Sequence, residues 1–142
     1  MANKHVGEDE ICLDCGCHQS NVMLELKSMC ESRELTDVCI IVDDRQFFCH
    51  RGVLAATSCY FRAMFTSGLG ESRQSDVRLH EVDAESVGAL ISYAYTGHIQ
   101  ITRHNVQNLM VTASLFQVNQ PFYSIHCCAQ PISVCNHISH IK

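Results

Sequence analysis

The sequence predicts an α+β fold in which a cluster of helices flanks a small β-sheet. Two observations support this class. Residues 38–42 form an apolar, mostly β-branched run that is typical of a buried strand, and apolar residues recur at helical spacing on both sides of this run. The chain has 142 residues, of which 46% are hydrophobic, so it is long enough to bury one core. We therefore expect one globular domain.

The first expected elements are a helix and a β-hairpin. Apolar residues fall on one face of a helix in the order Val22, Leu26, Met29 and Cys30. The buried strand 38–42 comes next. Polar residues connect it to a second strand that contains Phe47 and Phe48, which completes the hairpin.

Two short helices are expected in residues 50–65, with Ser58 as the N-cap of the second helix. A brief strand follows in residues 76–82. Asp83 is then placed to cap a longer helix, which Gly97 ends.

The last expected elements are a short alternating strand at residues 98–101 and a helix that opens at Thr102. The inner face of this helix is predicted to hold Val106, Leu109, Met110, Ala113 and Phe116. Residues 121–142 contain two prolines and no amphipathic period. We therefore expect three regions: a flexible N-terminal segment at 1–21, the domain at 22–120, and a divergent, disordered Cys- and His-rich tail at 121–142.

Charge and composition argue against several function classes. The formal net charge is −5 and no basic run is present, so nucleic-acid binding is not expected. No apolar stretch approaches the ~18 residues that a membrane span needs, and the first residues do not resemble a secretory signal. No P-loop, G-x-S-x-G or H-E-x-x-H motif is present, so we predict neither an enzyme nor a cofactor. The expected location is the cytoplasm, with the nucleus as a second compartment.

The chain contains ten cysteines, and their positions separate into two kinds. Four of them lie singly inside periodic apolar segments and are interpreted as reduced thiols: Cys30, Cys39, Cys49 and Cys59. The others cluster near the two ends. Four potential soft ligands occur close together near the N-terminus, and we treat them as weak candidates for metal binding: Cys12, Cys15, Cys17 and His18. A structural zinc site normally joins two separated ligand pairs, so no metal site is predicted.

His50 and the aromatic residues that follow it have competing interpretations. A histidine beside a helix start can serve catalysis or metal binding, but no nucleophile is positioned for it, so we predict a structural histidine. Aromatic and methionine side chains then recur at helical spacing and are expected to be mostly core: Tyr60, Phe61, Met64 and Phe65.

The run LTDVCIIVDDRQFFCHRGVLAATSCYFRAMFTSGLGES, followed by ISYAYTGHIQI, resembles the BTB (POZ) domain, and within it the kelch-like adaptor branch. The resemblance covers about residues 22–120. It implies a two-fold dimer with itself or with other BTB proteins, in which the first helix packs across the partner. The residues implied at that interface are Met23, Leu26 and Met29 on this helix, with Leu35 nearby, and the charged pair Asp37 and Arg51. We expect that pair to be buried, with an exposed pair as the alternative.

The same resemblance implies a second partner, the cullin scaffold of a cullin-RING (cullin three) ubiquitin ligase. Kelch-like adaptors use a hydrophobic residue, any residue and then Glu after the second short helix, a pattern that Leu69, Gly70 and Glu71 match. Tyr60 and Phe65 on the preceding helix are the further cullin-binding candidates. An apolar side chain beside a charge suits an interface, because the first contributes desolvation and the second fixes the register.

An alternative of a different class is a transcriptional module that binds corepressor peptides in the dimer groove. Such proteins normally carry zinc fingers after the domain, which this sequence lacks. In a complete kelch-like protein, a helical BACK region and a kelch propeller follow. A kelch repeat takes ~50 residues, and residues 121–142 supply neither region. We interpret the sequence as a truncated or alternative product that lacks its own substrate-recruiting propeller.

Overall fold

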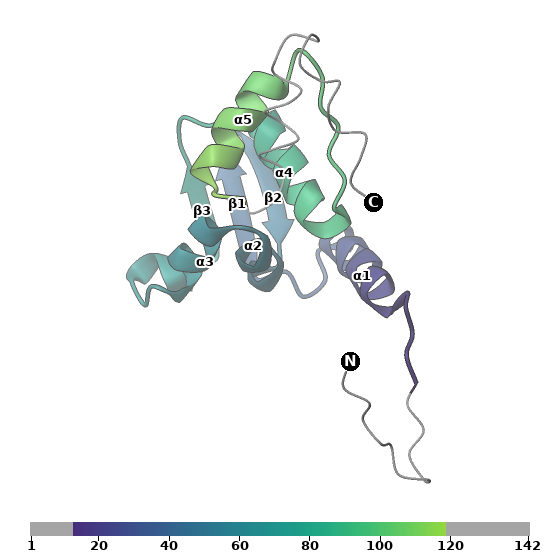
Figure 1. The fold of residues 1–142 in the computed structure, drawn as a ribbon. Helices are drawn as coiled ribbons and strands as arrows, with labels where there is room; N and C mark the ends of the chain where they lie inside the picture. Colours follow the sequence, from purple (N-terminus) through teal and green to yellow (C-terminus); the bar gives the residue numbers. More distant parts are fainter. Residues whose placement is uncertain (1–12, 119–142) are drawn as a thin grey trace, which may run out of the picture.

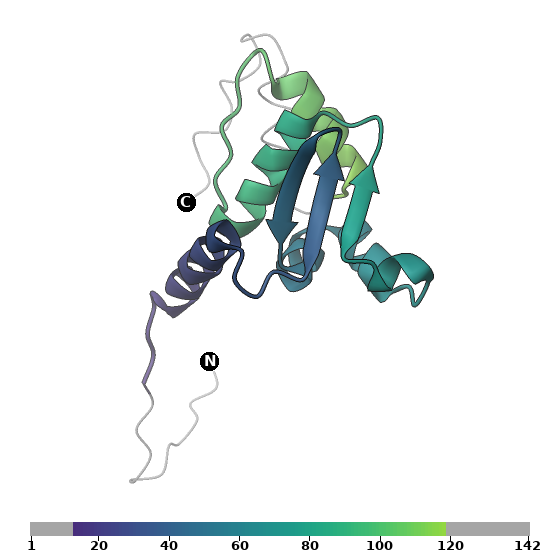
Figure 2. The same ribbon diagram turned by 180° about the vertical axis from the view of Figure 1, so that it is seen from behind.

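The structure is a computed structural model that describes residues 13–118, apart from the side chains of residues 71 and 72. A three-stranded sheet forms its centre, and the helices gather around one face and the ends of this sheet (Figures 1 and 2). The α+β class is confirmed. The predictions for the residues up to Cys12 and for the tail at 121–142 lie outside the described residues.

The central strand is β1 (Val38–Val42), which is buried along its whole length. It pairs antiparallel with β2 (Arg45–Cys49), with Val38 opposite Cys49, and this confirms the predicted hairpin. On its other side β1 pairs in parallel with β3 (Asp76–Leu79), so the strand order is β2-β1-β3.

The helices follow the predicted order. They are α1 (His18–Ser32), α2 (Arg51–Thr57), α3 (Cys59–Thr66), α4 (Ala84–Thr96) and α5 (Val106–Leu115), with a short 3-10 helix η1 (Gly70–Arg73) after α3. Figure 1 shows α4 and α5 lying across one face of the sheet, and Figure 2 shows the strands from the opposite side. None of the helices in residues 13–118 is long and apolar enough to cross a membrane.

The core lies between this sheet face and the helices. Ile40 of β1, Val87 of α4 and Leu109 of α5 have no exposed surface. Helix α4 also approaches the hairpin closely at Gly88, where an added Cβ atom would lie 2.9 Å from Cε1 of Phe47. The residue at position 88 must therefore be small for α4 to sit at this distance from β2.

The predicted helix caps at Ser58, Asp83 and Gly97 are confirmed. The Ser58 side chain accepts a hydrogen bond from the backbone N–H of Phe61, and the Asp83 carboxylate accepts one from that of Ser86 at 2.8 Å. Gly97 ends α4 in the left-handed conformation, with φ of 66°, which glycine adopts without steric cost.

Two helix starts and one strand were predicted wrongly. Helix α1 begins at His18, four residues before Val22, the first apolar residue of its predicted face. The added residues are polar and exposed to solvent. Residues 98–101 pair with no strand in the described part of the chain. The Gln100 carbonyl instead accepts a hydrogen bond from the Asn105 side chain at 3.1 Å.

The third error concerns the start of α5, which begins at Val106 and not at Thr102. Thr102 and Asn105 form reciprocal hydrogen bonds, from the Thr102 backbone N–H to Asn105 Oδ1 at 2.7 Å and from the Asn105 backbone N–H to Thr102 Oγ1 at 3.2 Å. These reciprocal bonds satisfy two backbone N–H groups in the turn before the helix, and the regular helix begins directly after Asn105.

Candidate protein-interaction surfaces

Helix α1 is the most weakly covered α-helix in residues 13–118, because none of its residues is buried. Met23, Leu26 and Met29, the predicted dimer contacts on this helix, are all half-buried. Met23 and Leu26 pack against the core of their own chain. The neighbouring apolar residues Val22 and Leu24 are 43% and 63% exposed. One chain therefore leaves much of the apolar surface of α1 in contact with water.

The groove beside α1 continues this apolar surface. A cavity of about 480 Å³ opens between the first half of α1 and the C-terminal end of α4. Met23 and Leu24 line it from α1, and Tyr93 and Ala94 line it from α4. After the helix, Leu35 is 81% exposed in a left-handed backbone conformation with φ of 52°. Apolar side chains thus lie open to solvent along and just beyond α1.

Asp37 and Arg51 lie together, as the sequence predicts, but the pair is not buried within one chain. Asp37 is exposed and Arg51 is half-buried. The Asp37 carboxylate accepts a hydrogen bond from the backbone N–H of Arg51 at 2.7 Å, and Arg51 Nε donates to the Asp37 carbonyl oxygen at 3.2 Å. Arg51 also donates to the Gln74 carbonyl oxygen. These hydrogen bonds connect the start of α2 to the residues just before β1 and β3.

The predicted cullin-binding residues lie on and just after α3. Leu69 is 66% exposed, whereas Tyr60 and Phe65 are half-buried. The Tyr60 ring stacks on Phe116 with 5.6 Å between ring centroids, and Phe65 stacks on Phe61 at 5.8 Å. The aromatic rings therefore have structural partners, as expected for a stripe that is mostly core, and Leu69 presents the largest exposed apolar surface of the group.

Glu71 belongs to η1, directly after Leu69 and Gly70, and its side chain lies outside the described residues. Beside this segment, a cavity of about 340 Å³ separates α3 from β3. Tyr60 and Met64 line the cavity from α3, and Asp76 and Arg78 line it from β3. The surface around α3 thus combines exposed apolar groups with charges of both signs.

The two surfaces lie at different ends of the domain. In Figure 1, α1 projects to the right of the sheet and the α3 end projects to the left, and Figure 2 shows the same separation from behind. The two surfaces therefore do not overlap on one chain.

His50 is a structural histidine, as predicted, because both ring nitrogens have partners. Nδ1 lies 2.8 Å from the Tyr95 hydroxyl and Nε2 lies 3.0 Å from the Glu34 carbonyl oxygen. The backbone N–H of His50 also donates to the Tyr95 hydroxyl at 2.9 Å. These contacts connect the hairpin, α4 and the segment after α1.

Of the weak metal candidates, Cys15 and Cys17 lie close together, with 3.3 Å between their sulfurs at the start of α1. The Cys17 side chain hydrogen-bonds the Cys15 sulfur and lowers the pKa of this exposed thiol below its usual value. His18 is the first residue of α1, and Cys12 lies outside the described residues. Among residues 13–118, no group of three or more possible ligands is close enough to hold a metal ion.

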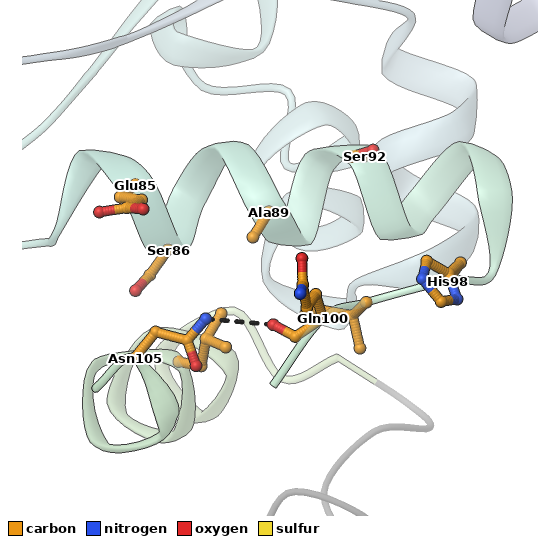
Figure 3. A pocket seen from close by; sticks show the side chains of 9 residues that line it. Glu85, Ser86, Ala89, Ser92, His98, Gln100 and Asn105 are labelled. Atoms are coloured by element: carbon orange, nitrogen blue, oxygen red, sulfur yellow. Dashed lines mark hydrogen bonds between the residues drawn. The ribbon is translucent and has the colours of Figure 1, made fainter. Parts of the chain in front are cut away.

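A polar cavity of about 320 Å³, which sequence analysis missed, lies between α4 and the segment that leads to α5. Figure 3 shows Ser86 and Ala89 of α4 pointing toward Gln100 and Asn105, and His98 lies at one end of the cavity. The Ser86 hydroxyl donates to the Asp83 carboxylate at 2.6 Å and so belongs to the helix cap. No sequence signal indicates the cavity, because its lining residues come from separate segments of the chain that only the tertiary fold brings together.

Exposed apolar side chains at two ends of a small α+β domain are typical of a protein-interaction module. The chain belongs to the BTB/POZ domain family, whose characteristic sequence matches residues 26–129. It is therefore a BTB/POZ protein-interaction module, and the resemblance found in the sequence is confirmed.

Several kelch-repeat proteins are similar to this chain. Kelch repeat and BTB domain-containing protein 8 of Rattus norvegicus is 50% identical over 102 residues, which cover 71% of the chain and 18% of the relative. The Homo sapiens protein of the same name is 48% identical, again over 71% of the chain, but over 17% of the relative. Kelch-like protein 21 of Danio rerio is 43% identical over 79% of the chain and 18% of its own length. The chain thus spans less than a fifth of the length of these relatives.

Proposed function

We propose that this BTB/POZ module forms a two-fold dimer and binds the cullin scaffold of a cullin-RING ubiquitin ligase. The dimer contacts are Met23, Leu26 and Met29 of α1, with Asp37 and Arg51 nearby, and the partner is a second copy or another BTB protein. The cullin contacts are Leu69, Glu71, Tyr60 and Phe65. The six free thiols at the described cysteines suit a reducing compartment, the cytoplasm or the nucleus.

The observation that carries the cullin proposal is the exposure of Leu69, which is 66% exposed at the end of the domain away from α1. Exposed apolar anchors surrounded by polar groups are common at the centre of protein interfaces. Glu71 follows in the sequence at the spacing found in kelch-like adaptors, so the anchor and a charge lie on one short segment.

The dimer proposal rests on the poor coverage of α1. A two-fold interface uses the same patch on both copies, so one exposed apolar helix is sufficient to form it. Covering the exposed parts of Val22, Leu24 and Leu35 with a second copy removes apolar surface from water at about 25 cal/mol per Å². Dimerisation at α1 also leaves Leu69 available for a second protein.

The test measures mass by size-exclusion chromatography with light scattering, on the full chain alone and mixed with the N-terminal domain of the cullin. We expect the mass of two chains, and a larger complex when the cullin domain is added. Leu69→Asp should weaken cullin binding by at least about tenfold, since a buried charge replaces an apolar anchor. Glu71→Lys should weaken binding as well, because it reverses the charge that fixes the register.

Leu115→Asp is the matched control, because Leu115 is also an exposed leucine at a helix end, with 51% of its surface accessible. It lies on α5, outside both proposed interfaces, so this variant should dimerise and bind cullin like the unchanged chain. Equal loss of cullin binding in the Leu69 and Leu115 variants would contradict the proposed contact. A monomeric chain that still binds cullin would contradict the dimer alone.

A further inference from the structure

The turn that leads into α1 brings two thiols together, and neither proposed interface uses them. Cys15 and Cys17 are both exposed, and 3.3 Å separates their sulfurs. The S–S bond of a disulfide is about 2.05 Å long, so the two sulfurs need to approach by only about 1.3 Å more to be bonded. No helix or strand has to move for this approach, because both residues precede the first regular turn of α1.

The backbone explains why the two sulfurs meet. The Cys15 carbonyl oxygen accepts a hydrogen bond from the backbone N–H of His18 at 3.0 Å, and the Cys17 carbonyl oxygen accepts one from that of Asn21, also at 3.0 Å. The first bond closes a tight turn and the second begins the helix. The turn therefore places the side chains on either side of Gly16 next to each other.

Gly16 gives this turn the freedom to close further. A disulfide between residues two positions apart forms a small ring, so the residue between them must be able to change its backbone angles. Glycine does so at little steric cost. No atom of the described residues outside its immediate chain neighbours lies within 4 Å of the position that a Cβ atom on Gly16 would occupy. The two sulfurs can therefore complete their approach without a clash at this residue.

The two thiols have different surroundings. The Cys17 side chain hydrogen-bonds the Cys15 sulfur and holds the pKa of Cys15 below that of an ordinary thiol. The partial positive charge at the start of a helix acts in the same direction. Cys15 is therefore the thiol that we expect to react first with an oxidant from solution.

The Cys17 sulfur is positioned to react second. It accepts a hydrogen bond from Nδ2 of Asn21, which lies one turn further along α1, at 3.6 Å. Cys17 is the N-cap residue of α1, but within residues 13–118 its side chain makes no capping hydrogen bond to this helix. The sulfur can therefore bond to Cys15 without removing a cap from the helix.

We propose that Cys15 and Cys17 are a redox-active pair that a low-molecular-weight disulfide oxidises reversibly to an intramolecular disulfide. In the first step the Cys15 thiolate attacks one sulfur of the small disulfide, its S–S bond breaks, and one small thiolate leaves and takes up a proton. The product is a mixed disulfide at Cys15. In the second step the Cys17 sulfur attacks the Cys15 sulfur, the mixed disulfide breaks, and the second small thiolate leaves with the proton of Cys17.

The balance is two protein thiols and one small disulfide in, and one protein disulfide and two small thiols out. The protein sulfurs lose two electrons in total and the small disulfide gains them. Exposed disulfides have higher reduction potentials than structural ones, so an excess of small thiol reverses both steps. The pair thus responds to the ratio of small disulfide to small thiol.

The pair lies at the edge of a proposed interface. Gln19, two residues after Cys17, is the first residue that lines the groove beside α1, and Met23 and Leu24 line it further along the helix. Oxidation replaces two thiols with a covalent ring at the start of this helix. The reaction itself needs one chain only, so it does not depend on the proposed dimer.

The test incubates the reduced full chain with mixtures of oxidised and reduced glutathione at neutral pH, without oxygen and with a metal chelator. The reaction is stopped with acid, and every cysteine is mapped by differential alkylation and mass spectrometry. Cys59 is the matched reference, because it is also exposed and stands at the start of another helix, α3.

We expect fragment ions that place an internal link between Cys15 and Cys17, and we expect this link to disappear when reduced glutathione is added in excess. Because the second step is intramolecular, the pair should oxidise at a ratio of oxidised to reduced glutathione at least about tenfold lower than Cys59.

Two variants sharpen the result. Cys17→Ser should fold, since serine is a good N-cap residue, and a mixed disulfide should then accumulate at Cys15. Cys12→Ser removes the other cysteine near this turn in the sequence and should leave the Cys15–Cys17 link unchanged.

A Cys12–Cys15 link in place of the Cys15–Cys17 link would overturn the proposal. A stable mixed disulfide at Cys15 in the unchanged chain would overturn it as well, because Cys17 would then not complete the second step.

Discussion

Helices α1 and α4 differ in how one chain covers them, although they have similar lengths of 15 and 13 residues. Helix α4 buries six residues, including Val87, Leu90 and Ile91, whereas α1 buries none. The apolar residues of α4 are explained by the core of one chain. Of the apolar residues of α1, Met23 and Leu26 pack against that core, but Val22 and Leu24 stay exposed, which is why we propose that α1 contacts another protein.

The largest expected effect comes from making the same substitution on each helix. Leu90→Ala removes a side chain that is 4% exposed, and it should lower the free energy of unfolding by about 2–5 kcal/mol, since it leaves a cavity in the core. Leu24→Ala removes one that is 63% exposed, and in the single chain it should change that free energy by less than about 0.5 kcal/mol. Urea unfolding followed by circular dichroism measures both.

The protein concentration must be the same for both variants, because dimerisation itself adds to the apparent stability. A loss of more than about 2 kcal/mol for Leu24→Ala at high concentration, which disappears on dilution, would show that a second copy covers α1. Equal losses for both variants at every concentration would remove the contrast between the two helices.

A smaller effect is expected from two glycines that lie in different helices. At Gly88 of α4 an added methyl group meets the Phe47 ring at 2.9 Å, whereas at Gly52 of α2 nothing lies within 4 Å of it. Gly88→Ala should destabilise the fold by about 1–3 kcal/mol, since the half-buried Phe47 ring must shift from its contact with α4. Gly52→Ala should stabilise it by up to about 1 kcal/mol through helix propensity. Thermal unfolding distinguishes the two signs, and a stabilised Gly88→Ala would mean that Phe47 moves freely.

Local signals were sufficient to predict most of the fold. The continuous apolar run of β1, the caps at Ser58 and Asp83, and the stop at Gly97 each depend on a few neighbouring residues, and each was correct. Two of the errors lie in the segment that leads into α5. Residues 98–101 pair with no strand in the described part of the chain, and α5 begins after the reciprocal hydrogen bonds between Thr102 and Asn105.

The details of the interaction surfaces were harder to predict from the sequence than the fold. The resemblance to BTB domains implied that Asp37 and Arg51 form a pair, but it did not show that the carboxylate binds a backbone N–H at 2.7 Å and stays exposed. Sequence patterns also gave no sign that the His50 ring meets the Tyr95 hydroxyl at 2.8 Å and the Glu34 carbonyl oxygen at 3.0 Å. These residues lie far apart in the chain, and only the tertiary fold brings them together.

The smallest expected effect tests the cap that starts α4. Hydrogen bonds from the hydroxyl and backbone N–H of Ser86 lower the pKa of Asp83 below its ordinary value. A carboxyl group with a lowered folded-state pKa stabilises the protein above its unfolded-state pKa, about 3.9. This stabilising contribution is lost as the pH falls from the unfolded-state pKa, about 3.9, through the lower folded-state pKa.

Asp83→Asn keeps a side chain that caps helices well and removes the titration. At pH 7 the variant should be less stable by less than about 1 kcal/mol, because the cap is near the surface and solvent screens its charge. Below about pH 4 the difference should shrink towards zero, since the wild-type carboxyl becomes protonated. Urea unfolding of both chains from pH 7 to pH 3 gives this difference directly. A difference that stays constant over this range would mean that the charge of Asp83 contributes nothing to the start of α4, and that the buried face of the helix alone determines its position.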